Sequence, residues 1–193
     1  MSVLPHELNQ LNPQSQDQVW MRCAIALARK GKYATRPNPN VGCVIVKDGQ
    51  MIGEGFHPQA GQPHAEVFAL RQAGEAARGA TAYVTLEPCA HYGRTPPCAK
   101  GLVEAGVKKV VVACTDPNPL VAGKGIDILR QAGVEVEVGI CEEEAKQLNK
   151  GFLKAMSTGM PYVRLKVASS LDGRTAMASG ESKWITGSEA RLD

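Results

Sequence analysis

A histidine, a glutamate and two cysteines stand at spacings that suit zinc chemistry. One residue separates His64 from Glu66, and Cys89 and Cys98 follow after a short apolar run. One imidazole and two thiolates supply three protein ligands, the pattern of a catalytic zinc site whose fourth tetrahedral position stays open. A proline directly precedes both His64 and Cys98, and if each proline stands at a helix N-terminus, the helix dipole favours the thiolate form. The alternative is a core histidine with two buried thiols.

Glu66 would stand beside such a zinc ion without being one of its ligands. Zinc lowers the pKa of bound water toward neutrality, so a carboxylate at this position can accept a proton and pass it to a leaving amino group. The order H-x-E followed by P-C-x-x-C is the signature of zinc deaminases. The sequence therefore predicts hydrolytic deamination with Glu66 as general acid and base. Glu87 is a second candidate base, but we expect it to accept hydrogen bonds from the backbone or from groups next to the ligands.

The second cysteine departs from that signature. The eight residues AHYGRTPP separate Cys89 from Cys98, where nucleoside deaminases have two. We expect this insert to loop out beside the zinc and to bring His91 and Arg94 toward the pocket. An arginine in that position would bind phosphate through its charge and its bidentate geometry.

Other polar residues have a functional and a structural interpretation. His57 could be a fourth ligand, but a residue at the end of a hairpin that bonds to the backbone is favoured. Asn38 lies in a proline-punctuated loop and could contact a base edge or simply form a turn. Gly123-Lys124-Gly125 is similar to a phosphate cradle, yet a turn into a helix is the better interpretation. The remaining cysteines are predicted bystanders: Cys23, Cys43 and Cys114 in the core, and Cys141 beside three glutamates.

Length and composition limit the classes of protein that fit. The 193 residues correspond to about 1.3 average domains. A hydrophobic content of 44% and a charged content of 21% disfavour disorder, and the net charge of +3 is scattered, which is unlike the footprint of a duplex-binding protein. The opening segment is polar and has no run that could be a signal or a membrane span, so a cytoplasmic location with no membrane partner is expected.

The elements that must position these residues alternate between helix and strand. A helix is expected from Asp17 to Gly31, a hairpin at 41–46 and 51–56, helices at 64–74, 98–106 and 126–133, strands at 81–87, 107–114 and 134–139, and a long helix at 141–159. This order predicts a three-layer α/β/α domain with a mixed, mainly parallel sheet behind one hairpin. A strand starting at 162, followed by a polar segment, is expected to begin a second domain whose remainder this chain lacks.

The sequence resembles the N-terminal deaminase half of the bifunctional deaminase/reductase family of riboflavin biosynthesis. The resemblance rests on PNPNVGCVIVKDG (37–49), PHAEVFAL (63–70), TLEPCAHYGRTPPCAKGL (85–102) and DPNPLVAGKGI (116–126). It continues through LNKGFLKAM (148–156) into 165–187, which is similar to the opening of the family's reductase domain. It implies a flexible extension over 1–16, a cytidine-deaminase-like domain over 17–160, and the first strand of an incomplete, dihydrofolate-reductase-like domain over 161–193.

The same resemblance implies an activity and residue roles. His64, Cys89 and Cys98 would bind zinc, Glu66 would shuttle the proton, and the substrate would be a small phosphorylated pyrimidine, 2,5-diamino-6-(5-phosphoribosylamino)pyrimidin-4(3H)-one. The implied substrate contacts are Asn38, His91, Arg94, Asp116 and Asn118. The positions that match NADPH or substrate contacts of the reductase are Lys166, Ala168, Ser182 and Trp184. A homo-oligomer is expected, with no nucleic-acid partner.

Two other functions stay open. The first is a zinc deaminase of another base, a nucleoside or tRNA, which would not depend on the substrate's 5′-phosphate. The second is a non-enzymatic, zinc-stabilised interaction module, which would have four protein ligands and no open coordination position.

Overall fold

The structure is a computed structural model that describes residues 12–90, 97–118, 121–183 and 187–192. The chain divides into two compact units, Met1–Pro161 and Tyr162–Asp193. His91, Arg94 and Trp184, which the sequence singles out, lie outside the described residues.

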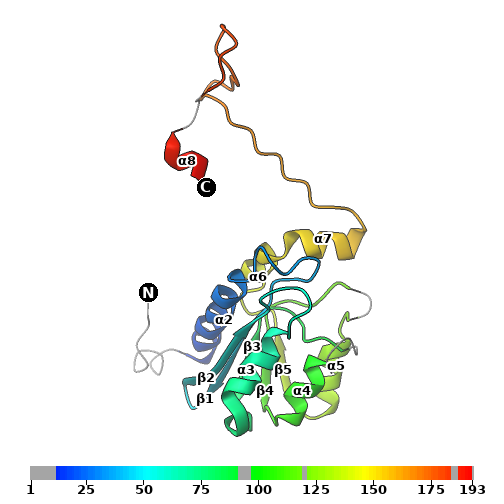
Figure 1. The fold of residues 1–193 in the computed structure, drawn as a ribbon. Helices are drawn as coiled ribbons and strands as arrows, with labels where there is room; N and C mark the ends of the chain where they lie inside the picture. The colour runs from blue at the N-terminus through cyan, green and yellow to red at the C-terminus, as the bar shows by residue number, and fades with distance from the viewer. Residues whose placement is uncertain (1–11, 91–96, 119–120, 184–186, 193) are drawn as a thin grey trace. The chain divides into compact units, whose positions relative to one another are not determined.

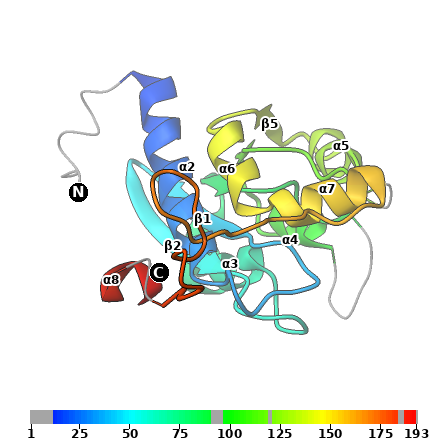
Figure 2. The ribbon, with the colours of Figure 1, turned by 90° about the horizontal axis from the view of Figure 1, so that it is seen from above.

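The first unit is built on one five-stranded sheet with the order β2-β1-β3-β4-β5 (Figure 1). Its strands are β1 (Gly42–Lys47), β2 (Gln50–Phe56), β3 (Thr81–Val84), β4 (Lys109–Val112) and β5 (Glu135–Val138). β1 is antiparallel to both β2 and β3, whereas β3, β4 and β5 pair in parallel. Four strands therefore share one direction, as expected for a mixed, mainly parallel sheet, and β2 and β5 lie at its opposite edges (Figure 2).

Helices cover both faces of this sheet. The described helices are α2 (Pro13–Arg29), α3 (Ala65–Ala73), the 3₁₀ helix η1 (Gly74–Ala77), α4 (Cys98–Glu104), α5 (Lys124–Gln131), α6 (Glu142–Leu148), α7 (Lys150–Thr158) and α8 (Ser188–Leu192). Side chains alternate along β1, so Cys43 and Ile45 pack with α3, α4 and α5, while Val44 and Val46 pack with α2 and α6. These two buried clusters confirm the predicted three-layer α/β/α architecture.

Glycines let the helices approach the sheet closely. A Cβ atom at Gly42 would lie 2.0 Å from the backbone oxygen of Ala24 in α2, and one at Gly55 would lie 2.3 Å from that of Ala65 in α3. Only glycine fits such contacts. Since Ala65 is the first residue of α3, the Gly55 contact holds the N-terminus of that helix, with His64 directly before it, against β2.

The structure corrects three expectations about the elements. The first helix begins at Pro13 rather than Asp17, because the Asn12 side chain accepts a hydrogen bond from the Ser15 N–H at 2.9 Å and Pro13 stands at the first helical position. The predicted helix 141–159 breaks at Asn149 into α6 and α7.

The third correction concerns the second unit. The strand predicted to start at 162 does not form, and residues 161–170 have no regular secondary structure. A strand needs a hydrogen-bonded neighbour, and the described residues of the second unit include none. Apolar side chains of this unit are exposed, Leu165 to 84% and Val163 to 79%.

No helix in the described parts of the chain is both long enough and apolar enough to cross a membrane.

Candidate active site

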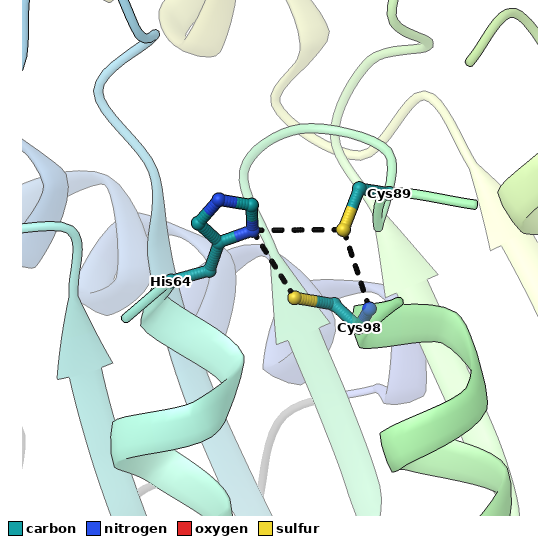
Figure 3. Close-up of side chains that lie close together, drawn as sticks. All are labelled: His64, Cys89 and Cys98. Atoms are coloured by element: carbon teal, nitrogen blue, oxygen red, sulfur yellow. Dashed lines mark hydrogen bonds between the residues drawn. The ribbon is translucent and has the colours of Figure 1, made fainter. Parts of the chain in front are cut away.

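Three side chains from separate parts of the sequence converge at one point (Figure 3). The Nδ1 atom of His64 lies 3.3 Å from the Cys98 sulfur and 3.6 Å from the Cys89 sulfur. One donor atom from each of the three residues lies within 4.8 Å of the others, and among the described residues no further His, Cys, Asp or Glu joins this group. The structure thus brings together the three residues whose types and spacing indicate a zinc site.

Two helix N-termini position these donors. His64 directly precedes α3, and Cys98 is the first residue of α4. The backbone N–H of Cys98 donates to the Cys89 sulfur at 3.3 Å, which ties the two cysteines together. Hydrogen bonds from the Cys98 thiol, and then from His64 and the Cys98 N–H, lower the pKa of Cys89 to about 4. Cys89 is therefore held as the thiolate, the form that binds metals.

The donor geometry fits zinc. Typical Zn–N and Zn–S bonds of about 2.0 and 2.3 Å place nitrogen and sulfur ligands about 3.6 Å apart across a tetrahedron edge. The separations of 3.3 and 3.6 Å between His64 and the two sulfurs match this value. Three donors leave one tetrahedral position without a protein ligand among the described residues.

Glu66 is a buried carboxylate that follows His64 closely in the sequence. It lies in the first turn of α3, is 3% exposed, and borders the same cavity as His64 and Cys89. Its Oε2 atom is buried and has no hydrogen-bond partner among the described residues. Burial raises the pKa of Glu66 to about 7. A buried carboxylate oxygen without a partner indicates that the site is completed by a further polar group, such as a water molecule or a substrate amine.

The cavity beside the three donors has a volume of about 190 Å³. Asn38, His57, Asp116 and Asn118, all polar, border it, and Leu86, Val121 and Phe152 contribute apolar surface. Of the expected substrate contacts, the structure therefore places Asn38, Asp116 and Asn118 at the cavity. His91 and Arg94 lie outside the described residues.

His57 uses both ring nitrogens in hydrogen bonds and is not a fourth ligand. Nδ1 lies 3.0 Å from the carbonyl oxygen of Pro63, and Nε2 lies 3.1 Å from Nδ2 of Asn38. Its ring contacts the His64 ring edge-on, with the centroids 5.4 Å apart. Burial lowers the pKa of His57. The favoured interpretation, a hairpin-end histidine bonded to the backbone, is confirmed.

Glu87 binds four backbone N–H groups. Its Oε1 accepts from Gly125 and Ile126 at 3.0 and 3.4 Å, and its Oε2 accepts from Gly123 and Asp116 at 3.0 and 3.3 Å. The expectation that Glu87 accepts backbone hydrogen bonds is confirmed. Because its carboxylate already occupies the N-terminus of α5, the glycines at 123 and 125 form a turn into the helix, as expected, rather than a phosphate cradle.

Asn149 is a structural residue that the sequence analysis missed. It stands between α6 and α7, is 4% exposed, and pairs with the backbone of Asn40: its Oδ1 accepts from the Asn40 N–H and its Nδ2 donates to the Asn40 carbonyl, both at 2.8 Å. This pairing holds the loop that carries Asn38 against α7, which contributes Phe152 to the cavity. An asparagine within a predicted helix was the only local signal.

The remaining predicted residues lie in the second unit. Lys166, Ala168 and Ser182 are all exposed. They form no site within the described residues of that unit, and their assignment to NADPH or substrate stays a prediction.

Comparison with known proteins identifies the family of the chain. Residues 14–114, more than half of the chain, match the model for the cytidine and deoxycytidylate deaminase zinc-binding region. The chain belongs to this deaminase family. Residues 161–193 match the model for the RibD C-terminal domain.

Individual relatives are similar over nearly the whole chain. The riboflavin biosynthesis protein RibD of Haemophilus influenzae is 68% identical over 93% of the chain and 48% of its own length. A solved structure of Acinetobacter baumannii RibD is 81% identical with a TM-score of 0.87, and covers 92% of this chain and 50% of that one. A further solved structure is that of a diaminohydroxyphosphoribosylaminopyrimidine deaminase/5-amino-6-(5-phosphoribosylamino)uracil reductase from Thermotoga maritima. It is 46% identical with a TM-score of 0.89, and the match covers 94% of this chain and 52% of that one. The chain thus spans about half the length of these relatives.

Proposed function

We propose that this chain catalyses a deamination in riboflavin biosynthesis. The reaction converts 2,5-diamino-6-(5-phosphoribosylamino)pyrimidin-4(3H)-one into 5-amino-6-(5-phosphoribosylamino)uracil and ammonia. Two observations together carry the proposal. Two thiols and an imidazole meet at one point, and the buried Oε2 of Glu66, which has no partner among the described residues, borders the same cavity as His64 and Cys89. The identity to RibD proteins and to the bifunctional Thermotoga maritima enzyme supports the choice of substrate.

In this proposal, His64, Cys89 and Cys98 hold zinc, and the donor types and separations fit that role. Bound zinc supplies Lewis-acid chemistry, which lowers the pKa of water toward neutrality. Its affinity for the protein depends on the thiolate that the Cys98 N–H stabilises at Cys89.

Glu66 moves the proton. Its Oε2 accepts a proton from the attacking water while a C–O bond forms at C2 of the pyrimidine, and it delivers that proton to the amino group when the C2–N bond breaks. One water is consumed and one ammonia is released. Oε2 has no partner among the described residues. It can therefore accept the proton from water, and later donate it to the amino group, without first breaking a hydrogen bond to the protein.

The polar wall of the cavity binds and orients the substrate. Asn38, Asp116 and Asn118 all border the cavity. Asp116 Oδ1 accepts a hydrogen bond from the Asn118 N–H at 2.8 Å, which shapes the turn that presents both residues. His91 and Arg94 belong to this proposal from the sequence alone, with Arg94 as the phosphate-binding residue.

The proposal extends to the organisation of the chain. Residues 17–160 are the deaminase domain, and 161–193 are the start of an NADPH-dependent reductase domain, which the match to the RibD C-terminal domain supports. A homo-oligomer and a cytoplasmic location are also part of it, and the six unpaired cysteines fit a reducing compartment.

An ammonia-release assay tests the function. The zinc-loaded chain should release ammonia from the phosphoribosyl-pyrimidine, and a chelator should abolish the release. Arg94→Ala should raise KM for the phosphorylated compound and leave KM for its dephosphorylated form unchanged. Equal use of the dephosphorylated compound, or release of ammonia only from a nucleoside or tRNA, would favour the first alternative.

Zinc-edge X-ray absorption tests the second alternative. A catalytic site should show two sulfur ligands, one nitrogen and one exchangeable oxygen. Four protein ligands would favour the interaction module.

A further inference from the structure

The orientation of the Asn38 amide follows from a chain of three hydrogen-bonding groups. The first is the carbonyl oxygen of Pro63, which can only accept. It lies 3.0 Å from Nδ1 of His57, so Nδ1 must carry a hydrogen and donate it.

The second step concerns the other ring nitrogen. His57 is 2% exposed, and its Nε2 faces Nδ2 of Asn38 at 3.1 Å. An amide nitrogen can only donate a hydrogen bond, so Nε2 is the acceptor of this contact. The two contacts of the ring therefore place its hydrogen on Nδ1 and leave Nε2 without one.

The third step orients Asn38. Only the amide nitrogen of Asn38 can donate to an accepting Nε2, and the structure places Nδ2 at 3.1 Å from it. The reversed amide would set two acceptors against each other. The amide oxygen of Asn38 therefore lies on the side of the amide group away from the contact with His57.

The loop around Asn38 is held independently of its side chain. The Asn38 N–H donates to the Thr35 carbonyl at 2.8 Å, and Asn149 pairs with the backbone of Asn40. The backbone of this loop is thus fixed by other contacts. The hydrogen bond to His57 therefore determines which atoms of the Asn38 side chain face a ligand in the cavity.

We propose that His57 is a positioning residue that presents the Asn38 amide oxygen as a hydrogen-bond acceptor, so that this wall of the cavity selects a ligand edge that donates, an amino group or a ring N–H. The inference rests on the proposed function, whose substrate carries such donors at its amino groups and at N3. A pyrimidine that offered only acceptors at this edge would be rejected, because an unmatched buried polar group costs binding energy.

Nuclear magnetic resonance of the ring nitrogens tests the first two steps without any catalysis. The chain has only four histidines, so a spectrum of the zinc-loaded, ¹⁵N-histidine-labelled protein, compared with that of His57→Phe, assigns the His57 signals. We expect a protonated Nδ1 and an unprotonated Nε2 at neutral pH. A hydrogen on Nε2 would overturn the inference whether or not the protein releases ammonia.

Kinetics of two substitutions at one position test the third step. His57→Phe keeps a flat ring but removes both hydrogen bonds, and we expect KM to rise about tenfold while kcat changes by less than about threefold. In His57→Gln, the amide can donate to Pro63 and accept from Asn38, so KM should return to within about threefold of the original value. Unchanged KM in His57→Phe, or a rise in His57→Gln as large as in His57→Phe, would contradict the proposal.

Thr35→Val is the matched control for a loss of loop stability. The Thr35 hydroxyl donates to Oδ1 of Asn40 at 3.1 Å in the same loop, and Thr35 is 1% exposed. This variant should lower Tm without raising KM. If it raises KM as much as His57→Phe does, the effect of His57 is on loop stability and the proposal is wrong. An absence of ammonia release by the original protein would instead overturn the proposed function and leave the tautomer result standing.

Discussion

Glu87 gives the sharpest test of how the cavity wall is built. Its carboxylate, 4% exposed, accepts hydrogen bonds from the N–H groups of Asp116, Gly123, Gly125 and Ile126. In Glu87→Gln, one carboxylate oxygen becomes an NH₂ group, so the two N–H groups that it served lose their acceptor and face another donor. The side-chain volume is nearly unchanged, and the effect is therefore one of hydrogen bonding rather than packing.

The magnitude follows from the number of bonds. A buried donor without a partner costs about 1–3 kcal/mol, so two of them should lower the free energy of unfolding by about 4 kcal/mol. For a domain of this size, each kcal/mol corresponds to about 2–4 °C in Tm, and the expected decrease is about 8–16 °C.

Thermal unfolding at saturating zinc measures this difference. Glu142→Gln is the matched control, because Glu142 also lies in the first turn of a helix but is 44% exposed and contacts Lys146 at 2.9 Å. An exposed ion pair contributes less than about 1 kcal/mol, so the control should shift Tm by less than about 4 °C. A shift below about 2 °C in Glu87→Gln, or equal shifts in the two variants, would refute the role given to Glu87.

Three further predictions concern the metal, the loop and a buried thiol. Cys89→Ser should lower the zinc content measured by metal analysis, whereas Cys23→Ser should not, and equal loss in both would contradict the ligand assignment. Asn149→Ala should lower the free energy of unfolding, measured in urea, by about 2 kcal/mol, because the Asn40 N–H and carbonyl lose their hydrogen-bond partners. An unchanged urea midpoint would contradict the role given to the pairing of Asn149 with Asn40. Burial raises the pKa of Cys114 from 9.0 to about 12, so above pH 9 the unfolded chain loses a proton that the folded chain keeps. Between pH 9 and 12, the free energy of unfolding should therefore decrease more steeply in the original protein than in Cys114→Ala, by up to about 1.4 kcal/mol per pH unit. Parallel curves of this free energy against pH for the two proteins would refute the prediction.

The metal-binding residues could be predicted from the sequence because their chemistry is local. The spacing of His64 and Glu66, and the two cysteines that each follow a proline, restrict the possible ligands even without a fold. The sheet was equally accessible, since the apolar strands and the helices alternate along the chain. Even the early start at Pro13 had a local signal, an asparagine followed by a proline, which went unused.

The pairing of Asn149 with the backbone of Asn40 could not be predicted, because these residues are 109 positions apart in the sequence. Helical periodicity continues through Asn149, and nothing nearby in sequence shows that its amide faces the backbone of Asn40. The orientation of the Asn38 amide could not be predicted from a sequence pattern either, because it depends on how His57 and Pro63 lie next to Asn38 in the folded structure. The strand expected at 162 failed for a related reason: a strand pattern does not supply the neighbouring strand that it needs.

The most direct test of the account combines metal analysis with ammonia release in Glu66→Gln. This substitution removes the buried carboxylate whose Oε2 atom has no partner in the described part of the chain, and it leaves His64, Cys89 and Cys98 in place. The variant should keep its zinc content and should release ammonia from the phosphoribosyl-pyrimidine at least about 100-fold more slowly than the original protein. Ammonia release within about tenfold of the original rate, at equal zinc content, would show that Glu66 does not move the proton and would contradict the mechanism.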